Sequence, residues 1–314
     1  MSAELKDKID GRRVVASISG GKDSAAMSLW LTEQGIDHDR VFMDTGWEHE
    51  KTYEYLRGEL TKALGPIIEI NAGLTLPEHI DATKLRPLVR AAVESGNQMV
   101  ILVLRKGMFA SRVIRFCTEE LKVFPLQRFI NKRVDAGEEI LNSVGIRREE
   151  SKAREAALEW EWSSGFDCEV WRPLLAWRFG DVIDIHARHQ LKPSPLYLDG
   201  ALRVGCWPCQ FSQKSEIRLL GNDPARIALM RELEADMTDL ARQRDPGARE
   251  RTFFAGRIAG RGYPIDEALE WSRTSRGGRQ FEMFAADPAD AGCMRWGLCE
   301  TATENADGTS GGGK

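Results

Sequence analysis

The chain has 314 residues, with 44 Lys and Arg side chains against 48 Asp and Glu and a formal net charge of −4. This length allows a sizeable core in one large or two modest domains, and the near balance of charge excludes a strongly basic nucleic-acid-binding protein. Residues 1–13 are polar, and the apolar run Met99–Leu104 is too short to cross a bilayer. We therefore expect a cytoplasmic protein with no membrane partner.

The first part of the chain alternates between two hydrophobic patterns. Strands are expected at residues 13–18, 40–43 and 67–70, and helices at 24–34 and 50–64. Later elements continue the series: a helix at 118–132, strands at 140–144 and 171–175, and a helix at 180–189. This rhythm predicts an α/β fold with a doubly wound parallel sheet, covered by helices on both faces.

The alternation stops after Cys209. Apolar residues at helical spacing over 224–244 indicate a helical C-terminal appendage, and residues 273–279, rich in Arg, Gly and Ser, are expected to form a loop. We predict a nucleotide-binding domain at 1–212, a mainly helical region at 213–300 and a disordered tail at 301–314.

A glycine-rich turn joins the first expected strand to the first expected helix. It contains Ser17, Ser19, Gly20, Gly21, Lys22, Asp23 and Ser24. Paired glycines let the backbone approach an anion closely, while the free N–H groups and the positive dipole end of the next helix favour phosphate. Lys22 adds a positive charge. The turn therefore predicts a nucleotide site, and Asp44, at the end of the next strand, would lie beside it and could reach ribose, base or Mg²⁺.

This Ser-Gly-Gly-Lys-Asp-Ser turn resembles the PP-loop of the adenine nucleotide alpha-hydrolase superfamily, which cuts ATP between the α and β phosphates. Residues 44–46, 115–122, 145–154, 171–174 and 203–206 resemble the phosphoadenosine phosphosulfate reductase family within it. The resemblance covers roughly residues 12–213 and implies a PP-loop fold. Within this fold we expect Lys22, Asp23 and Arg147 to act in catalysis, and Asp44 and Arg154 to bind the nucleotide.

The chain also departs from the reductases. They carry a Glu-Cys-Gly-Leu/Ile-His segment near the C-terminus, whereas the nearest candidate here is Cys299 within Trp296–Glu300. The full PP-loop is expected where pyrophosphate must be gripped, so ATP is the favoured substrate. The closest functional analogues are the ATP pyrophosphatases of DNA phosphorothioation systems, which carry an iron-sulfur cluster.

The chain contains six cysteines but no secretory signal, so metal or redox chemistry is favoured over structural disulfides. Cys206 and Cys209 lie one tight turn apart, and Cys117 with Cys293 or Cys299 can complete four ligands. Such a set suits zinc or an iron-sulfur cluster, and a redox disulfide is a further reading. The resemblance favours [4Fe-4S]. We take Cys117, Cys206, Cys209 and Cys293 as its ligands, with Cys299 as the alternative to Cys293. Cys168 has no partner motif and is expected in the core.

The expected reaction is adenylation of an acceptor oxygen by ATP and Mg²⁺, after which sulfur replaces the adenylate. In DNA phosphorothioation the acceptor is DNA, and a cysteine desulfurase or another donor protein supplies sulfur. Between Ile101 and Asp135, eight basic residues against three acidic ones form either a DNA contact or a solvated helix face. Three other functions stay open: a thioredoxin-dependent sulfonucleotide reductase using Cys299, thiolation of tRNA or a small molecule, and an ATP-binding scaffold without turnover.

Overall fold

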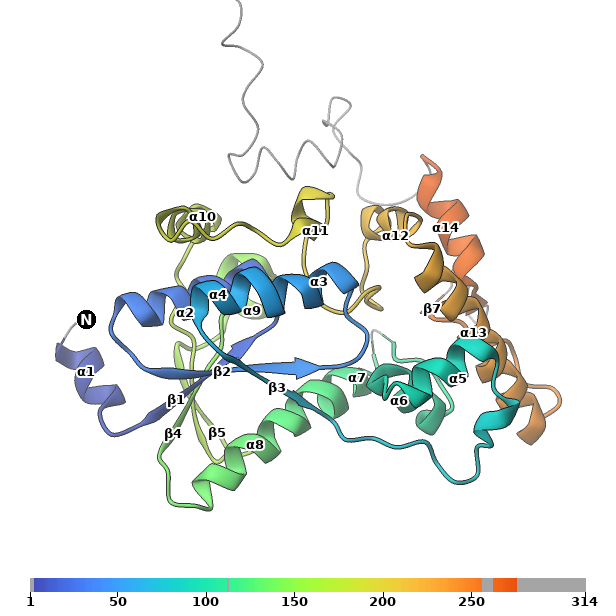
Figure 1. Ribbon diagram of the computed structural model, residues 1–314, viewed down its shortest axis with the longest axis horizontal. Coiled ribbons are helices and arrows are strands. Elements are labelled where there is room, and N and C mark those ends of the chain that lie inside the picture. Colours follow the sequence, from blue (N-terminus) through green and yellow to red (C-terminus); the bar gives the residue numbers. More distant parts are fainter. Residues whose placement is uncertain (1–2, 112, 256–261, 276–314) are drawn as a thin grey trace, which may run out of the picture.

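The computed structural model describes residues 3–111, 113–255 and 262–275. Its centre is a six-stranded sheet in the order β3-β2-β1-β4-β6-β5 (Figure 1). The strands are β1 (Arg13–Ile18), β2 (His38–Asp44), β3 (Ile67–Asn71), β4 (Ile140–Ser143), β5 (Trp160–Ser163) and β6 (Cys168–Trp171). Every neighbouring pair is parallel except β5 and β6, which are antiparallel.

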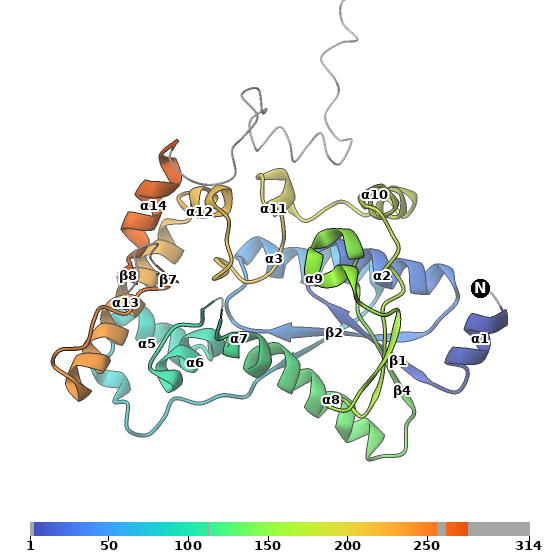
Figure 2. The ribbon, with the colours of Figure 1, turned by 180° about the vertical axis from the view of Figure 1, so that it is seen from behind.

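Alternate residues of β1 face two different layers. Val14, Ala16 and Ile18 pack with α2 (Lys22–Glu33), whereas Val15 packs with α8 (Phe124–Val134) on the other face. The first face also carries α10 (Phe179–Arg188) and the continuous helical segment α3 (Glu50–Tyr55), η1 (Leu56–Leu60) and α4 (Thr61–Leu64). Figure 2, from the opposite side, shows α8 beneath the sheet. The predicted doubly wound α/β fold is confirmed.

A second, helical core lies beyond the carboxyl ends of the strands (Figure 1). It combines α5 (Pro87–Glu94) and α6 (Gln98–Lys106) with α12 (Lys214–Leu220), α13 (Pro224–Arg244) and α14 (Ile265–Arg273). Arg86 joins the two stretches, because its guanidinium lies 2.5 Å from Asp236 on α13 and 2.8 Å from Asp239. The helical appendage therefore packs on helices from the first half of the chain.

The remaining described elements have two to five residues each, except α1, which has seven. They are α1 (Ala3–Ile9), η2 (Ala82–Lys84), α7 (Phe116–Thr118), η3 (Glu119–Val123), η4 (Arg148–Glu150), α9 (Lys152–Glu155), α11 (Pro195–Leu198), β7 (Phe254–Ala255) and β8 (Gly262–Tyr263). No helix in the described part of the chain is both long and apolar enough to cross a membrane.

One strand of the sheet was predicted wrongly. The strand expected at 171–175 ends at Trp171, because Pro173 has no N–H to continue the ladder and residues 172–175 form a turn instead. The sheet is also not wholly parallel, because β5 returns antiparallel along β6. In the loop expected at 273–279, Arg273 is the last residue of α14, and residues 276–279, like the tail at 301–314, lie outside the described residues.

Candidate functional site

The glycine-rich turn connects β1 to α2 as the sequence predicts. Gly20 has φ +73°, and a Cβ there would lie 2.9 Å from Cγ2 of Thr52. Gly21 is extended, with φ −86° and ψ 159°, and α2 begins at Lys22. Only glycine satisfies both the left-handed backbone and the close contact at position 20. The turn therefore places the start of α2 at the carboxyl end of β1, as an anion-binding loop requires.

Two serines brace this turn from within. Oγ of Ser24 accepts from the Ser19 amide at 3.1 Å, donates to the Gly21 carbonyl at 3.0 Å and lies 3.1 Å from Oγ of Ser19. Ser17 lies on β1 on the same side as Val15, and within the described chain no hydrogen bond joins its side chain to the turn. The structure thus brings together Ser19 and Ser24 but leaves Ser17 outside this network.

Lys22 is held through its backbone as well as its side chain. Its N–H donates to the Tyr197 hydroxyl at 3.2 Å, and its carbonyl lies 3.0 Å from Nε2 of His186 on α10. The ammonium lies 3.3 Å from Asp23 and 5.1 Å from the centre of the Tyr197 ring. Lys22 and Asp23 therefore lie together at the start of α2, as predicted.

Arg147 joins the loop after β4 to the glycine-rich turn. Its side chain is 3% exposed, Nε donates to Asp23 at 2.6 Å, and the guanidinium also pairs with Glu149. Burial opposes the charge, but Asp23 and Glu149 outweigh it and raise the pKa of Arg147. The approach is close because Gly145 has no side chain, since a Cβ there would lie 2.8 Å from the Asp23 carbonyl oxygen.

Arg154 lies one step farther from the turn. It pairs with Glu150, whose carboxylate accepts from the Arg147 amide at 2.9 Å. Arg154 is thus linked to Arg147 through Glu150, and no contact between Arg154 and the glycine-rich turn is seen among the described residues.

Asp44, at the end of β2, belongs to a network of carboxylates. Its Oδ1 accepts from the Gly46 amide at 2.8 Å and from the Tyr53 hydroxyl at 2.7 Å. That hydroxyl also lies 3.1 Å from Glu48, which is 1% exposed and accepts from Oγ1 of Thr45 at 2.8 Å. Burial first, then the charges of Glu48 and Asp44, raise the pKa of Tyr53. Tyr53 therefore stays a hydrogen-bond donor between two carboxylates.

Glu48 connects this network to the thiols. It forms a β-bridge with Cys206, and its Oε1 lies 3.9 Å from Sγ of Cys206 and 3.8 Å from Nζ of Lys122. Burial raises the pKa of Cys206 to about 11 against the opposing effect of Lys122. The thiolates of Cys209 and Cys117 raise it further, so these two sulfurs lie within electrostatic range of Cys206.

The thiols do not make a complete metal site in the described chain. Cys117, Cys206 and Cys209 are free thiols, but within residues 3–111, 113–255 and 262–275 no group of three His, Cys, Asp or Glu side chains is arranged to hold a metal ion. Cys293, the predicted fourth ligand, lies outside the described residues, as does Cys299. Cys168 packs with Val15 and Ile130 in the layer beneath the sheet, as expected of a core residue.

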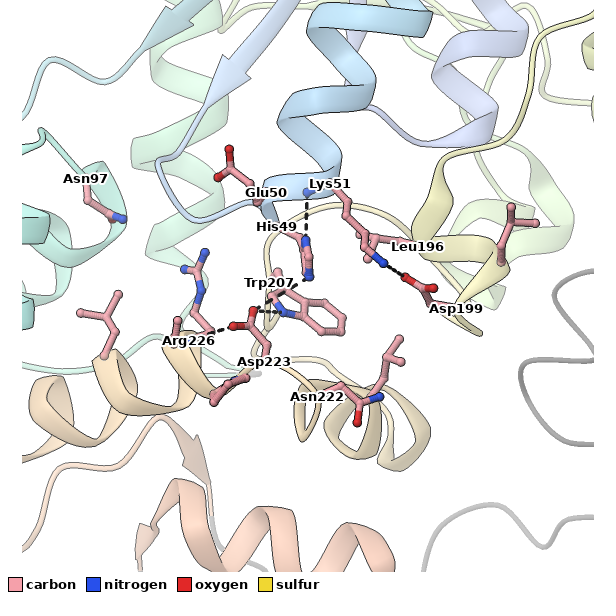
Figure 3. A pocket seen from close by; sticks show the side chains of 15 residues that line it. His49, Glu50, Lys51, Asn97, Leu196, Asp199, Trp207, Asn222, Asp223 and Arg226 are labelled. Carbon is pink, nitrogen blue, oxygen red and sulfur yellow. Dashed lines mark hydrogen bonds and ion pairs between the residues drawn. The ribbon is translucent and has the colours of Figure 1, made fainter.

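A cavity of about 740 Å³ opens between α3, α11 and the start of α13 (Figure 3). Charged groups in its wall pair with other residues of the same wall: Lys51 lies 2.6 Å from Asp199, and Asp223 accepts a hydrogen bond from Nε1 of Trp207 at 3.1 Å. Burial lowers the pKa of His49, which lies in the same wall. Trp207, which follows Cys206 in the chain, also lines the cavity.

A model of the phosphoadenosine phosphosulfate reductase domain matches residues 13–211. The chain belongs to this family. An uncharacterised 37.8 kDa protein of Escherichia phage 186 is 30% identical over 324 residues, covering 91% of this chain and 96% of its own length. A phosphoadenosine 5'-phosphosulfate reductase of Synechococcus is 26% identical over 197 residues, which cover 63% of this chain and 74% of that protein. The solved phosphoadenylyl-sulfate reductase of Candida auris, in a phosphate complex, is 16% identical with a TM-score of 0.45, covering 67% and 97%.

In this member of the phosphoadenosine phosphosulfate reductase family, much of the basic stretch 101–135 has partners within the chain. Lys106 pairs with Glu120, Arg133 pairs with Asp39, and Arg128 donates to the Ala72 carbonyl at 2.9 Å. Arg115 lies 4.5 Å from the centre of the Phe211 ring. These cations stabilise the fold, and the stretch is accordingly less available to a polyanion than its composition predicts.

Several site residues of this reductase-family chain were missed from the sequence. Glu48, four residues after the end of β2, and Tyr53, on α3, were given no role from the sequence, although a carboxylate two residues past Gly46 is a usable signal. His186, 2% exposed, carries no sequence motif, and its Nε2 lies 3.0 Å from the carbonyl oxygen of Lys22. Tyr197 gave no local signal, because its partner Lys22 is far away in the chain.

Proposed function

We propose that the protein is an ATP pyrophosphatase that adenylates an acceptor oxygen for sulfur transfer, with DNA as the acceptor in phosphorothioate modification. One observation carries the proposal: the complete Ser-Gly-Gly-Lys-Asp-Ser turn closes β1 with a left-handed Gly20 and starts α2 at Lys22. A helix start with an adjacent ammonium group suits the β and γ phosphates of ATP.

In this proposal, the acceptor oxygen forms a bond to the α phosphorus while the bond from that phosphorus to the bridging oxygen breaks. Pyrophosphate leaves with the electron pair, and the amides of α2 and the Lys22 ammonium stabilise its growing charge. Arg147, fixed by Asp23 at 2.6 Å, is placed to hold the α phosphate. Asp23 is already bonded to two cations, which favours Asp44 as the carboxylate for Mg²⁺; the metal would offset phosphate charge.

The decisive experiment compares Lys22→Ala with Lys84→Ala, a matched control whose side chain is 78% exposed on the surface. Equilibrium dialysis measures ATP binding. The release of labelled pyrophosphate from γ-labelled ATP, in the presence of Mg²⁺ and DNA, measures the reaction. We expect Lys22→Ala to lose both and Lys84→Ala to keep both. Unchanged binding and release in Lys22→Ala would remove the turn from the reaction.

We further propose a [4Fe-4S] cluster held by Cys117, Cys206, Cys209 and Cys293. This cluster is supported by the three described thiols, which are close enough to affect one another's pKa. No step of the adenylation described above depends on the cluster. Anaerobic purification with iron and sulfide analysis tests it: Cys206→Ser should lose iron and Cys168→Ser should retain it. Stoichiometric zinc in a colourless protein would contradict the cluster. A cysteine desulfurase or another donor protein, acting in the cytoplasm, is the proposed sulfur source.

A second candidate function is a thioredoxin-dependent sulfonucleotide reductase. The family match and the resemblance to a Synechococcus reductase favour it. Its attacking thiol would be Cys299. Sulfite released from phosphoadenosine phosphosulfate by the wild type, and lost in Cys299→Ser, would support this enzyme and displace the ATP pyrophosphatase.

A further inference from the structure

Tyr197 occupies both anion-recognising groups of Lys22. Its hydroxyl accepts the Lys22 N–H at 3.2 Å, and its ring lies 5.1 Å from the Lys22 ammonium. Lys22 is the first residue of α2, so its amide has no acceptor inside the helix. Tyr197 is 5% exposed. The same amide and ammonium are the groups that a phosphate would need.

The Tyr197 hydroxyl also lies close to Gly21. A Cβ at Gly21 would lie 3.5 Å from the Tyr197 hydroxyl, so that oxygen rests directly against the turn. From the other side, Nε2 of His186 lies 3.0 Å from the Lys22 carbonyl. The peptide groups on either side of Lys22 are thus gripped by α10 and α11, and only the α11 partner lies at the phosphate-facing N–H.

α11 is tied to a second part of the molecule. Leu196 and Leu198, which flank Tyr197, line the cavity beside α3, and Asp199 pairs with Lys51 at 2.6 Å (Figure 3). Both partners of that ion pair are about 40% exposed, with values of 44% and 37%. An exposed pair of this kind is weak. α11 therefore has one face on the turn, one face on the cavity and a weak latch to α3.

We infer that Tyr197 is a gate for the nucleotide site. Its hydroxyl takes the place of a phosphate oxygen at the Lys22 amide, and ATP exchanges that hydrogen bond for its own as α11 moves away from the turn. This inference rests on the proposed function, because it concerns the same site. Since α11 also forms a wall of the cavity, its position links the cavity to nucleotide binding.

The test measures ATP binding by equilibrium dialysis in wild type, Tyr197→Phe and Tyr263→Phe, a matched control on β8 that packs against the helical core. Phe removes the hydroxyl that competes for the Lys22 amide, together with its hydrogen bond to the Val204 backbone. We expect Tyr197→Phe to bind ATP about two- to tenfold more tightly, the range expected for one hydrogen bond. Tyr263→Phe should match wild type. Equal or weaker binding in Tyr197→Phe, with normal binding in wild type, would overturn the gate and leave the proposed function intact. Absence of binding in all three proteins would overturn both.

A second readout does not depend on the stability of the Phe variant. The chain has four tyrosines, so ¹⁹F NMR of the 3-fluorotyrosine protein resolves few signals, and Tyr197→Phe assigns one of them. Saturating ATP should shift the Tyr197 resonance, and Asp199→Asn, which weakens the latch, should shift it part of the way without nucleotide. An unchanged Tyr197 resonance at saturating ATP would show that the hydroxyl stays in place and would refute the gate.

Discussion

Gly145→Ala tests how the loop after β4 supports the nucleotide turn. The added Cβ would lie 2.8 Å from the carbonyl oxygen of Asp23, 3.1 Å from its carbonyl carbon and 3.1 Å from Cα of Ser24. These are backbone atoms of the first turn of α2, so no side chain can rotate away. To restore an ordinary contact of 3.4 Å, the loop or the helix start must move by about 0.6 Å.

We expect two measurable effects of this displacement. Overpacking lowers the free energy of unfolding by about 1–3 kcal/mol. Movement of Asp23 also disturbs its 2.6 Å contact with Arg147, and pyrophosphate release should fall by roughly 10- to 100-fold, since misplacement by about 1 Å can have that effect. Urea unfolding and a pyrophosphate assay measure them. Gly58→Ala is the control, because a Cβ there meets nothing within 4 Å. Wild-type stability and release in Gly145→Ala would refute this account of the turn.

Three further predictions concern the turn and the helical core. Gly20→Ala should abolish ATP binding in the dialysis assay, because position 20 has φ +73° and an added Cβ would lie 2.9 Å from Thr52. The double variant Gly20→Ala/Thr52→Ser relieves the contact but not the backbone strain, so it should recover only part of the ATP binding. Full recovery would mean that the left-handed backbone at position 20 is unimportant. Arg86→Ala should lower the free energy of unfolding by about 1–3 kcal/mol, because the carboxylate of Asp236, which is 4% exposed, loses its cation. The control Arg231→Ala, at the exposed ion pair with Asp266, should change the free energy of unfolding by under about 0.5 kcal/mol. Equal effects of the two substitutions in urea unfolding would count against this distinction. Burial raises the pKa of Glu234 from 4.5 to about 7, so the native state holds this proton more tightly than the unfolded state. The stability that this group contributes is present below pH 4.5 and falls by about 3 kcal/mol as the pH rises to 7. Glu234→Gln should lack that pH dependence in a series of unfolding curves, and an unchanged dependence would contradict the assignment.

The sequence was sufficient where the physical signal is local. The apolar run of β1 followed by paired glycines predicted the strand, the turn and α2 within two residues. α13 spans Pro224–Arg244, the residues predicted, because Asp223 caps it, Pro224 suits a first helical position and the apolar spacing runs to its end. Such elements are specified by residues a few positions apart.

The signal was weaker where the fold depends on distant contacts. β5 has only four residues with Glu161 and Trp162 exposed, so its pattern gives little sign of a strand, and its pairing with β6 fixes it. The charge excess at 101–135 was counted correctly, but composition does not show that Arg133 on α8 pairs with Asp39 on β2. Partner identity over long sequence separations is a property of the fold.

The candidate site divides in the same way. Lys22, Asp23 and Arg147 were named from motifs, and their contacts join residues more than a hundred positions apart that the topology of β1 and β4 brings together. Glu48 and Tyr197 carry no motif of their own. Their roles come from the space they fill, Glu48 between Tyr53 and Cys206, and Tyr197 against the Lys22 amide.

The helical core assembled from two distant stretches has a practical consequence for anyone who trims this protein. A fragment cut at residue 211 would retain the whole domain match, yet it would strip α12, α13 and α14 from α5 and α6. Val89, Leu102 and Trp207 would then meet water, and such bare apolar surface promotes aggregation. The homology boundary is therefore a poor place to end an expression clone, and the full-length phage relative offers the safer guide.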